Sequence, residues 1–301
     1  MKNKSILFFF LILISYGCAK EEAPKIDLNI SGGEVGGQYQ SSSQTVTFTT
    51  NKSWTATVTG SGSPSWVSVR PTSGKAGTIT LNVDMLANTM YQSREAVVTL
   101  TAGSVTSTFR VRQEAAPPTV TIDKNGQSIG SDAGTATVAV STNGAPWSLT
   151  GLPSWMTASS SSGTTATTVT FTYQANILAI AREANIVFTS VTATQTHTIT
   201  QTAAPATIAL DQNAKTVEST SGNFSVAVTT NSAAWKASGI PAWVTLTPSE
   251  NTGSGNVVVN YTQNATNTSR EVTITFTSGS AVKTLKITQL RTGGYIDGGD
   301  L

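Results

Sequence analysis

The chain has 301 residues, a length that usually folds as two or three domains. Its formal net charge is only +2, and Lys2 and Lys4 both lie in the N-terminal segment, so the rest of the chain is neutral overall. A neutral chain excludes a nucleic-acid-binding protein, which needs a concentration of Lys and Arg. The single cysteine excludes an internal disulfide, so each domain must be stabilised by its hydrophobic core.

Residues 1–17 have the features of a bacterial signal peptide. Two lysines precede an unbroken apolar stretch, Ile6 to Ile14, which is too short to span a bilayer but has the length of a signal-peptide core. The Ser-Tyr-Gly-Cys that follows resembles a lipobox, in which a small residue precedes the cysteine that becomes lipidated. We therefore expect Cys18 to carry a lipid anchor and residues 18–25 to form a linker. Cleavage at another position is the alternative.

The residues directly after Cys18 predict where the protein is delivered. Ala19-Lys20-Glu21-Glu22 resembles the signal that sends Bacteroidetes lipoproteins to the outer leaflet of the outer membrane. It predicts a lipoprotein that the membrane holds through its N-terminal lipid and that is exposed at the cell surface. The alternative is an ordinary charge cluster in a linker, with the protein on the periplasmic face.

The remainder of the chain is a threefold tandem repeat, as landmarks recurring at a step of about 88 residues indicate. Each unit has an early tryptophan, a Pro-x-Trp turn, an Arg-Glu pair and a closing glutamine. In chain order these landmarks are Trp54, Trp66, Arg94-Glu95 and Gln113, then Trp147, Trp155, Arg182-Glu183 and Gln201, then Trp235, Trp243, Arg270-Glu271 and Gln289.

Within each unit the apolar residues recur with a period of two, as in Ala96, Val98 and Leu100. Thr fills many intervening positions, and glycine-rich turns separate the runs, which is typical of strands with one buried and one solvated face. The pattern predicts an all-β protein of three tandem Ig-like β-sandwich domains in a linear array. We place these domains at residues 26–115, 119–203 and 207–290.

The joints between the units contain proline, at Pro117-Pro118 and at Pro205, and are too short to be loose tethers. Three domains in line would extend over roughly 100 Å. The segment 291–301 contains two Gly-Gly pairs, and we expect it to be a flexible tail.

The recurring landmarks also carry a family resemblance. The order of a Thr-Asn turn, a tryptophan, a Pro-x-Trp turn, an Arg-Glu pair and a closing glutamine resembles the BACON domain of Bacteroidetes, three times over nearly all of residues 26–290. The resemblance implies an all-β sandwich, a surface or periplasmic setting and an association with the use of complex glycans. In unit two the Ser/Thr-rich turn 159–168 and the segment 177–181 depart from the pattern.

The sequence offers no constellation for catalysis. His197, the single histidine, replaces Phe109 and Leu285 of the other units in the closing strand, so we expect it to face the core. A metal site or a catalytic triad would need it in a cleft with partners. Glycoside hydrolysis needs two carboxylates across a cleft. Each unit here has only one recurring acid, namely Glu95, Glu183 and Glu271. We therefore predict a non-catalytic protein with no metal and no cofactor.

The tryptophans are the candidate binding residues. Sugars are held by aromatic faces, which makes Trp66, Trp155, Trp243, Trp54, Trp147 and Trp235 candidates for glycan contact. The alternative is that they fill cores that have no disulfide. For Arg94, Arg182 and Arg270 we expect a structural role at the end of the core, with ligand contact as the alternative.

Two functions follow from these alternatives, and of the two the sequence favours the first. In the first, the units bind or adhere to complex glycans such as polysaccharide or mucin, and three weak sites gain avidity. In the second, the array is a structural stalk that presents a partner protein away from the outer membrane. Exposed tryptophans would favour the first function and buried ones the second.

Overall fold

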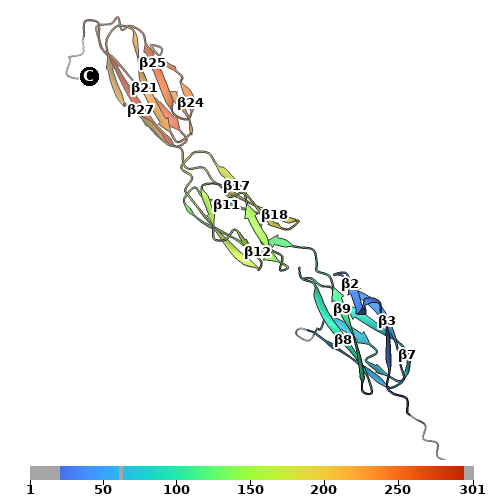
Figure 1. Cartoon of the computed structure of the whole chain (residues 1–301). Helices are drawn as coiled ribbons and strands as arrows, with labels where there is room; N and C mark the ends of the chain where they lie inside the picture. Colours follow the sequence, from blue (N-terminus) through green and yellow to red (C-terminus); the bar gives the residue numbers. More distant parts are fainter. Residues whose placement is uncertain (1–20, 61–63, 295–301) are drawn as a thin grey trace, which may run out of the picture. The chain divides into compact units, whose positions relative to one another are not determined.

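The computed structural model describes residues 21–60 and 64–294. The signal peptide and Cys18 lie outside these residues, as does the end of the expected tail from residue 295. The described chain folds as three tandem Ig-like β-sandwiches, each with its own strands and its own core (Figure 1). The predicted fold class is confirmed. No helix in the described ranges is long and apolar enough to cross a membrane.

Domain 1 contains nine strands and one turn of 3-10 helix. They are β1 (Ile26–Asn29), η1 (Ser31–Gly33), β2 (Glu34–Gly37), β3 (Ser42–Thr50), β4 (Trp54–Thr59), β5 (Val67–Arg70), β6 (Ser73–Gly74), β7 (Gly77–Met85), β8 (Arg94–Ala102) and β9 (Val105–Gln113). One sheet has the order β1-β3-β7-β5 and the other β2-β9-β8-β4-β6.

Domains 2 and 3 repeat this topology strand for strand, with sheets β10-β12-β16-β14 and β11-β18-β17-β13-β15, then β19-β21-β25-β23 and β20-β27-β26-β22-β24. Domain 2 consists of β10 (Val120–Ile122), β11 (Gly126–Ile129), β12 (Gly134–Thr142), β13 (Trp147–Thr150), β14 (Met156–Ala158), β15 (Ser162–Gly163), β16 (Thr167–Tyr173), β17 (Arg182–Ser190) and β18 (Ala193–Gln201). Domain 3 consists of β19 (Ile208–Leu210), β20 (Ala214–Val217), β21 (Gly222–Thr230), β22 (Ala234–Ser238), β23 (Val244–Thr247), β24 (Glu250–Thr252), β25 (Gly255–Tyr261), β26 (Arg270–Ser278) and β27 (Ala281–Gln289).

The core of each domain lies between its two sheets and follows from the period-two pattern. In β8 the residues Ala96, Val98 and Leu100 are all buried, while their neighbours face outward. The same alternation in the facing sheet buries Phe48 and Leu81 of domain 1. Because each buried side chain of this size contributes about 1.5–3 kcal/mol, such a core can hold a domain without disulfides.

The chain enters and leaves each domain at opposite ends of a long strand. In domain 1, the first residue of β1 pairs with Thr50 at the end of β3, whereas the exit after Gln113 lies beside the loop that leads into the start of β3. In domain 3, Ile208 pairs with Thr230, and the exit residue Leu290 bonds to Val217 just before β21 begins. The strand between the two ends has nine residues, or about 30 Å at the usual rise per residue. We call these the entrance end and the exit end of a domain.

One strand pair in each domain is parallel. β2 pairs with β9, β11 with β18 and β20 with β27, in four-residue ladders that join the second strand of the domain to its last. All other strand pairs are antiparallel. The last strand is therefore held on one side by its hairpin partner and on the other by a strand from the start of the domain.

Candidate functional site

The three early tryptophans are core residues at the entrance ends. Trp54, Trp147 and Trp235 are only 2–3% exposed. Trp54 packs edge-on against Phe48, with ring centroids 4.9 Å apart. Trp235 packs on Phe276 and donates from Nε1 to the Gly253 carbonyl at 3.1 Å. Their faces are in contact with the protein interior, so this set offers no platform for a sugar.

The three later tryptophans lie at the exit ends, half-buried, and each carries an arginine on its ring. The Arg94 Cζ lies 4.5 Å from the centroid of Trp66. The equivalent distances are 4.2 Å for Arg182 on Trp155 and 4.3 Å for Arg270 on Trp243. The rings also pack against the core residues beneath them. One ring face therefore contacts the core and the guanidinium covers part of the other.

The closing glutamine completes this arrangement, which we call the Trp–Arg–Gln cluster. Arg182 Nε donates to Gln201 Oε1 at 2.7 Å, and Gln201, which is fully buried, donates from Nε2 to the carbonyls of Ser131, Asp132 and Gln174. In the other domains the same Nε to Oε1 bond measures 2.8 Å. The cluster joins the Pro-x-Trp turn, the first residue of the Arg-Glu strand and the last residue of the closing strand. The sequence landmarks thus meet at a single place in each domain.

The arginines of the clusters have no acidic partner within 4 Å among the described residues. Burial alone lowers the pKa of each of them, Arg94, Arg182 and Arg270, yet a guanidinium stays charged in proteins. Nη2 donates to a backbone carbonyl, in domain 2 to Gln174 at 2.7 Å. The expected structural role of these arginines matches this geometry, because the charge is held by backbone dipoles at the end of the core.

A buried asparagine that sequence reasoning missed stands beside each cluster. Asn88, Asn176 and Asn264 are 1–3% exposed. Asn176 Nδ2 donates to the carbonyls of Ile180 and Thr202, at 2.7 and 3.0 Å, and Oδ1 accepts from the amide of Leu178. The asparagine side chain therefore links the loop before the Arg-Glu strand to the first residue after the closing strand. Its spacing of 88 residues in the sequence was the signal that could have revealed it.

The Thr-Asn turns at the entrance ends hold the incoming chain. Asn51 Oδ1 accepts from the amide of Lys25 at 2.9 Å, and Nδ2 donates to the carbonyl of Ala23 at 2.8 Å. Asn231 makes the equivalent bonds to Thr207 and Pro205. These turns, which carried part of the family resemblance, are therefore structural.

The titratable groups form no reactive constellation among the described residues. His197 is fully buried, as its strand parity predicts; Nδ1 lies 2.9 Å from the Lys124 carbonyl, and burial lowers its pKa. The recurring acids are exposed and pair with neighbours on the sheet surface, for example Glu271 with Lys286 at 3.0 Å. In the described ranges no group of three or more metal-binding side chains is close enough to hold an ion.

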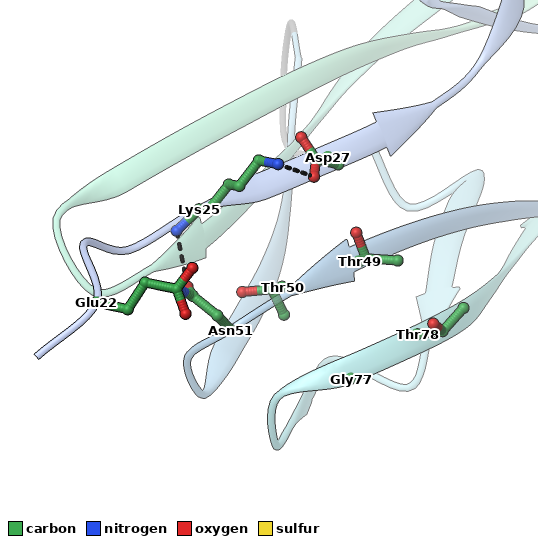
Figure 2. A pocket seen from close by; sticks show the side chains of 8 residues that line it. All are labelled: Glu22, Lys25, Asp27, Thr49, Thr50, Asn51, Gly77 and Thr78. Atoms are coloured by element: carbon green, nitrogen blue, oxygen red, sulfur yellow. Dashed lines mark hydrogen bonds and ion pairs between the residues drawn. The ribbon is translucent and has the colours of Figure 1, made fainter.

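Three clefts of the described surface lie at different places in their domains and are lined mainly by polar residues. One cleft of about 330 Å³ lies at the entrance end of domain 1, between Glu22, Lys25, Asp27 and Thr78 (Figure 2). Figure 2 shows Lys25 bonded to Asp27 and, through its backbone amide, to Asn51. Two others lie beside β2 of domain 1 and beside β19 of domain 3. None has an aromatic lining residue, so they differ from a repeated sugar site.

The repeated segments match a known family. A family model described as "BACON: Putative binding domain, N-terminal" matches residues 52–114, 145–202 and 233–290, more than half of the chain. This chain belongs to the BACON family. The resemblance noted in the sequence is confirmed in all three units. Each BACON match includes the complete Trp–Arg–Gln cluster but begins after the first three strands of the sandwich.

Comparison with whole proteins adds little to the family assignment. No curated protein matches this BACON chain. Among solved structures, a Bacteroides ovatus GH5 xyloglucanase in complex with a XXXG heptasaccharide is 22% identical, with a TM-score of 0.28, and the match covers 31% of this chain and 19% of the enzyme. This chain therefore spans about a fifth of the length of that enzyme. An I-band fragment from titin is 7% identical, with a TM-score of 0.47, and the match covers 89% of this chain and 98% of the fragment.

Proposed function

We propose that this protein is a non-catalytic surface lipoprotein, anchored through Cys18, whose three BACON domains form a stalk. The observation that carries the proposal is the position of the two chain ends in each domain. Because the chain enters at one end of a nine-residue strand and leaves at the other, each domain separates the segment that precedes it from the segment that follows it by about its own length. The short joints with proline support the same function.

The recurring residues support a stalk because each has a structural task. The early tryptophans fill the cores, the buried asparagines hold the exit loops, and the arginines bond to backbone carbonyls. A glycan-binding array would repeat one cleft with an aromatic wall, whereas the three clefts described above lie at different places and have no aromatic lining residue. The neutral, hydroxyl-rich surface fits a stalk in an aqueous extracellular setting.

Small-angle X-ray scattering on the mature chain tests the stalk. The chain from residue 18, with Cys18→Ser to remove the lipid, should have a maximum dimension of about 100 Å and a radius of gyration of about 30 Å. A compact arrangement of the same length would give a radius of gyration of roughly 19 Å. The compact value would contradict the stalk. Removing residues 119–206 should shorten the maximum dimension by about a third.

Glycan binding is the second candidate, and one observation favours it. Trp155 is only half-buried beside Arg182, a cation that has no carboxylate partner among the described residues, and the other domains repeat the pair. A uronate or a sulfated sugar could meet both groups there. Acrylamide quenching of tryptophan fluorescence with a panel of neutral and acidic polysaccharides tests this site. Protection by an acidic glycan that Arg182→Ala abolishes would support binding; no protection by any glycan would exclude it.

A further inference from the structure

We propose that each domain is a link that bears tension, in which the parallel ladder between its second and last strands resists a pull in shear and the Trp–Arg–Gln cluster locks the end of that ladder. The inference rests on the proposed stalk, because a stalk that is held at both ends carries any pull between them. It assigns to the repeated cluster a mechanical task that a mere spacer does not need.

The parallel ladder joins the second strand of a domain, which follows the short first strand at the entrance, to the last strand, from which the chain leaves. In domain 2, Gly126–Ile129 of β11 pairs in parallel with Thr198–Gln201 of β18. The ladder is extended at both ends by backbone bonds, from the Thr198 amide to the Asn125 carbonyl at 2.9 Å and from the Thr202 amide to the Ile129 carbonyl at 3.0 Å. Domains 1 and 3 have four-residue ladders of the same register with the same closing bond, from Glu114 to Gly37 and from Leu290 to Val217.

The direction of a pull makes the load on this ladder a shear. The chain enters through β10, which pairs over only three residues with β12. Once that short pairing yields, tension from the anchor draws β11 toward the entrance end. Tension from the C-terminal side draws β18 toward the exit end. Because the two strands are parallel and adjacent, the two forces act along the strand axes in opposite directions. Evenly spaced bonds then share the load and must break together, whereas a hairpin pulled open at its ends loses its bonds one after another.

The Trp–Arg–Gln cluster holds the ladder at the exit end, where it would begin to slide. Gln201 is the last residue of β18, and its Nε2 bonds to the carbonyls of Ser131 and Asp132, which follow β11 in the chain. A slide of β18 past β11 must break these side-chain bonds as well as the ladder. Arg182 on the hairpin partner strand holds the Gln201 side chain in this position, and Trp155 packs on the guanidinium. All three domains repeat the arrangement, with Gln113 bonded to Tyr39 and Gln40, and Gln289 to Ser219 and Thr220.

Force spectroscopy on single molecules tests the inference on the mature chain with Cys18→Ser, held at its two ends. The unaltered chain should unfold in three discrete events. Arg182→Lys keeps the charge but cannot reproduce the Nε bond to Gln201 together with the planar stack on Trp155. We expect one of the three domains to unfold about tenfold faster at the same force. Forced unfolding reports the unfolding rate, so domains 1 and 3 serve as internal controls in each trace.

A core variant distinguishes the mechanical role of the Trp–Arg–Gln cluster from its contribution to the equilibrium stability of the domain. Val169→Ala shortens a buried side chain of β16, a strand that belongs to neither side of the ladder. At a loss of equilibrium stability equal to that of Arg182→Lys, Val169→Ala should change the forced unfolding rate less than threefold. Equal increases in the forced unfolding rate for the two variants would contradict the mechanical role of the cluster. A chain that extends without discrete unfolding events would contradict the proposal that each domain bears tension. Neither result concerns the length of the stalk, which the scattering experiment decides independently.

Discussion

The two tryptophan sites of each domain recur with the same regularity and have different environments. At the entrance end Trp54, Trp147 and Trp235 are buried among the side chains of both sheets. At the exit end Trp66, Trp155 and Trp243 are half-buried under an arginine. The first set contributes area to the core, and the second supports a polar network in which the arginine and the glutamine bond to the backbone.

This difference shows that recurrence of an aromatic residue does not identify a ligand platform. Both sets of tryptophans make their contacts inside the domain. The first set packs against apolar side chains, and the second set contacts an arginine that is itself hydrogen-bonded. The entrance site should therefore respond to loss of volume, and the exit site to loss of hydrogen-bond donors. The following predictions test that distinction in domains 2 and 3.

The largest effect is expected for Trp235→Ala at the entrance end of domain 3. The change removes a ring that packs on Phe276 and leaves a cavity in a core without disulfides, and we expect a loss of about 3–5 kcal/mol in the free energy of unfolding of that domain. Hydrogen exchange of the domain 3 amides measures it separately from the other domains. Trp147→Ala should leave those amides protected. A loss below about 1 kcal/mol would show that Trp235 is not a core residue.

A smaller effect is expected for Arg270→Ala at the exit end of the same domain. The variant leaves the buried Oε1 of Gln289 without its donor and removes one of the two donors to the carbonyl of Thr262, and an unsatisfied buried group of this kind destabilises by about 1–3 kcal/mol. Arg270→Lys should restore less than half of the loss, because Lys cannot both stack and donate in one plane. Lys286→Ala removes an exposed cation as the control and should change stability by less than about 1 kcal/mol. Equal losses for Arg270→Ala and Lys286→Ala would contradict the role of the cluster.

Domain 2 should differ from the other domains in its response to pH, because His197 occupies a core position of the closing strand. Burial lowers its pKa below the ordinary 6.5, so the unfolded state binds the proton more readily than the folded state. The stability of domain 2 is therefore complete above that value and falls as the pH drops through it. Hydrogen exchange at pH 7 and pH 5 should show this loss in domain 2 alone.

His197→Leu supplies the residue that domain 3 has at this position, Leu285, and should remove the dependence between pH 7 and pH 5. The interval stays above the ordinary pKa of the glutamates, such as Glu271, whose pKa a hydrogen bond from Lys286 lowers further. A pH response of equal size in domain 3 would assign the effect to another group.

The sequence predicted the strands and their buried faces because a period of two fixes the face of every residue. Ala96, Val98 and Leu100 are buried as expected, and His197 is buried by the same parity. The period contains no information about which strand lies beside which. The parallel pairing of β11 with β18 therefore could not be predicted, since it depends on a contact across the whole length of the domain.

The site was predictable in its members but not in its connections. Trp155, Arg182 and Gln201 were recognised as landmarks, and the structure brings them together by crossing between the two sheets. Trp155 follows a proline turn and lies outside the alternating strands. The alternation of apolar residues therefore could not predict whether its side chain faces the core or the surface. Asn176 was missed because a lone asparagine in a loop carries no periodicity of its own, and only its recurrence at steps of 88 residues as Asn88 and Asn264 marks it.

The smallest effect is expected when the same substitution, Trp to Phe, is made separately at the two tryptophan sites of domain 3. Trp243→Phe keeps an aromatic ring beneath Arg270 and shortens a side chain that is only half-buried, so we expect a loss below about 1 kcal/mol in the free energy of unfolding. Trp235→Phe removes the same atoms from a ring that is 3% exposed, and also the donor to the Gly253 carbonyl, and should cost at least twice as much. Hydrogen exchange of domain 3 compares the two. If Trp243→Phe were the more damaging change, the exit ring would support the domain through packing, and the cluster would depend on its tryptophan more than on its hydrogen bonds.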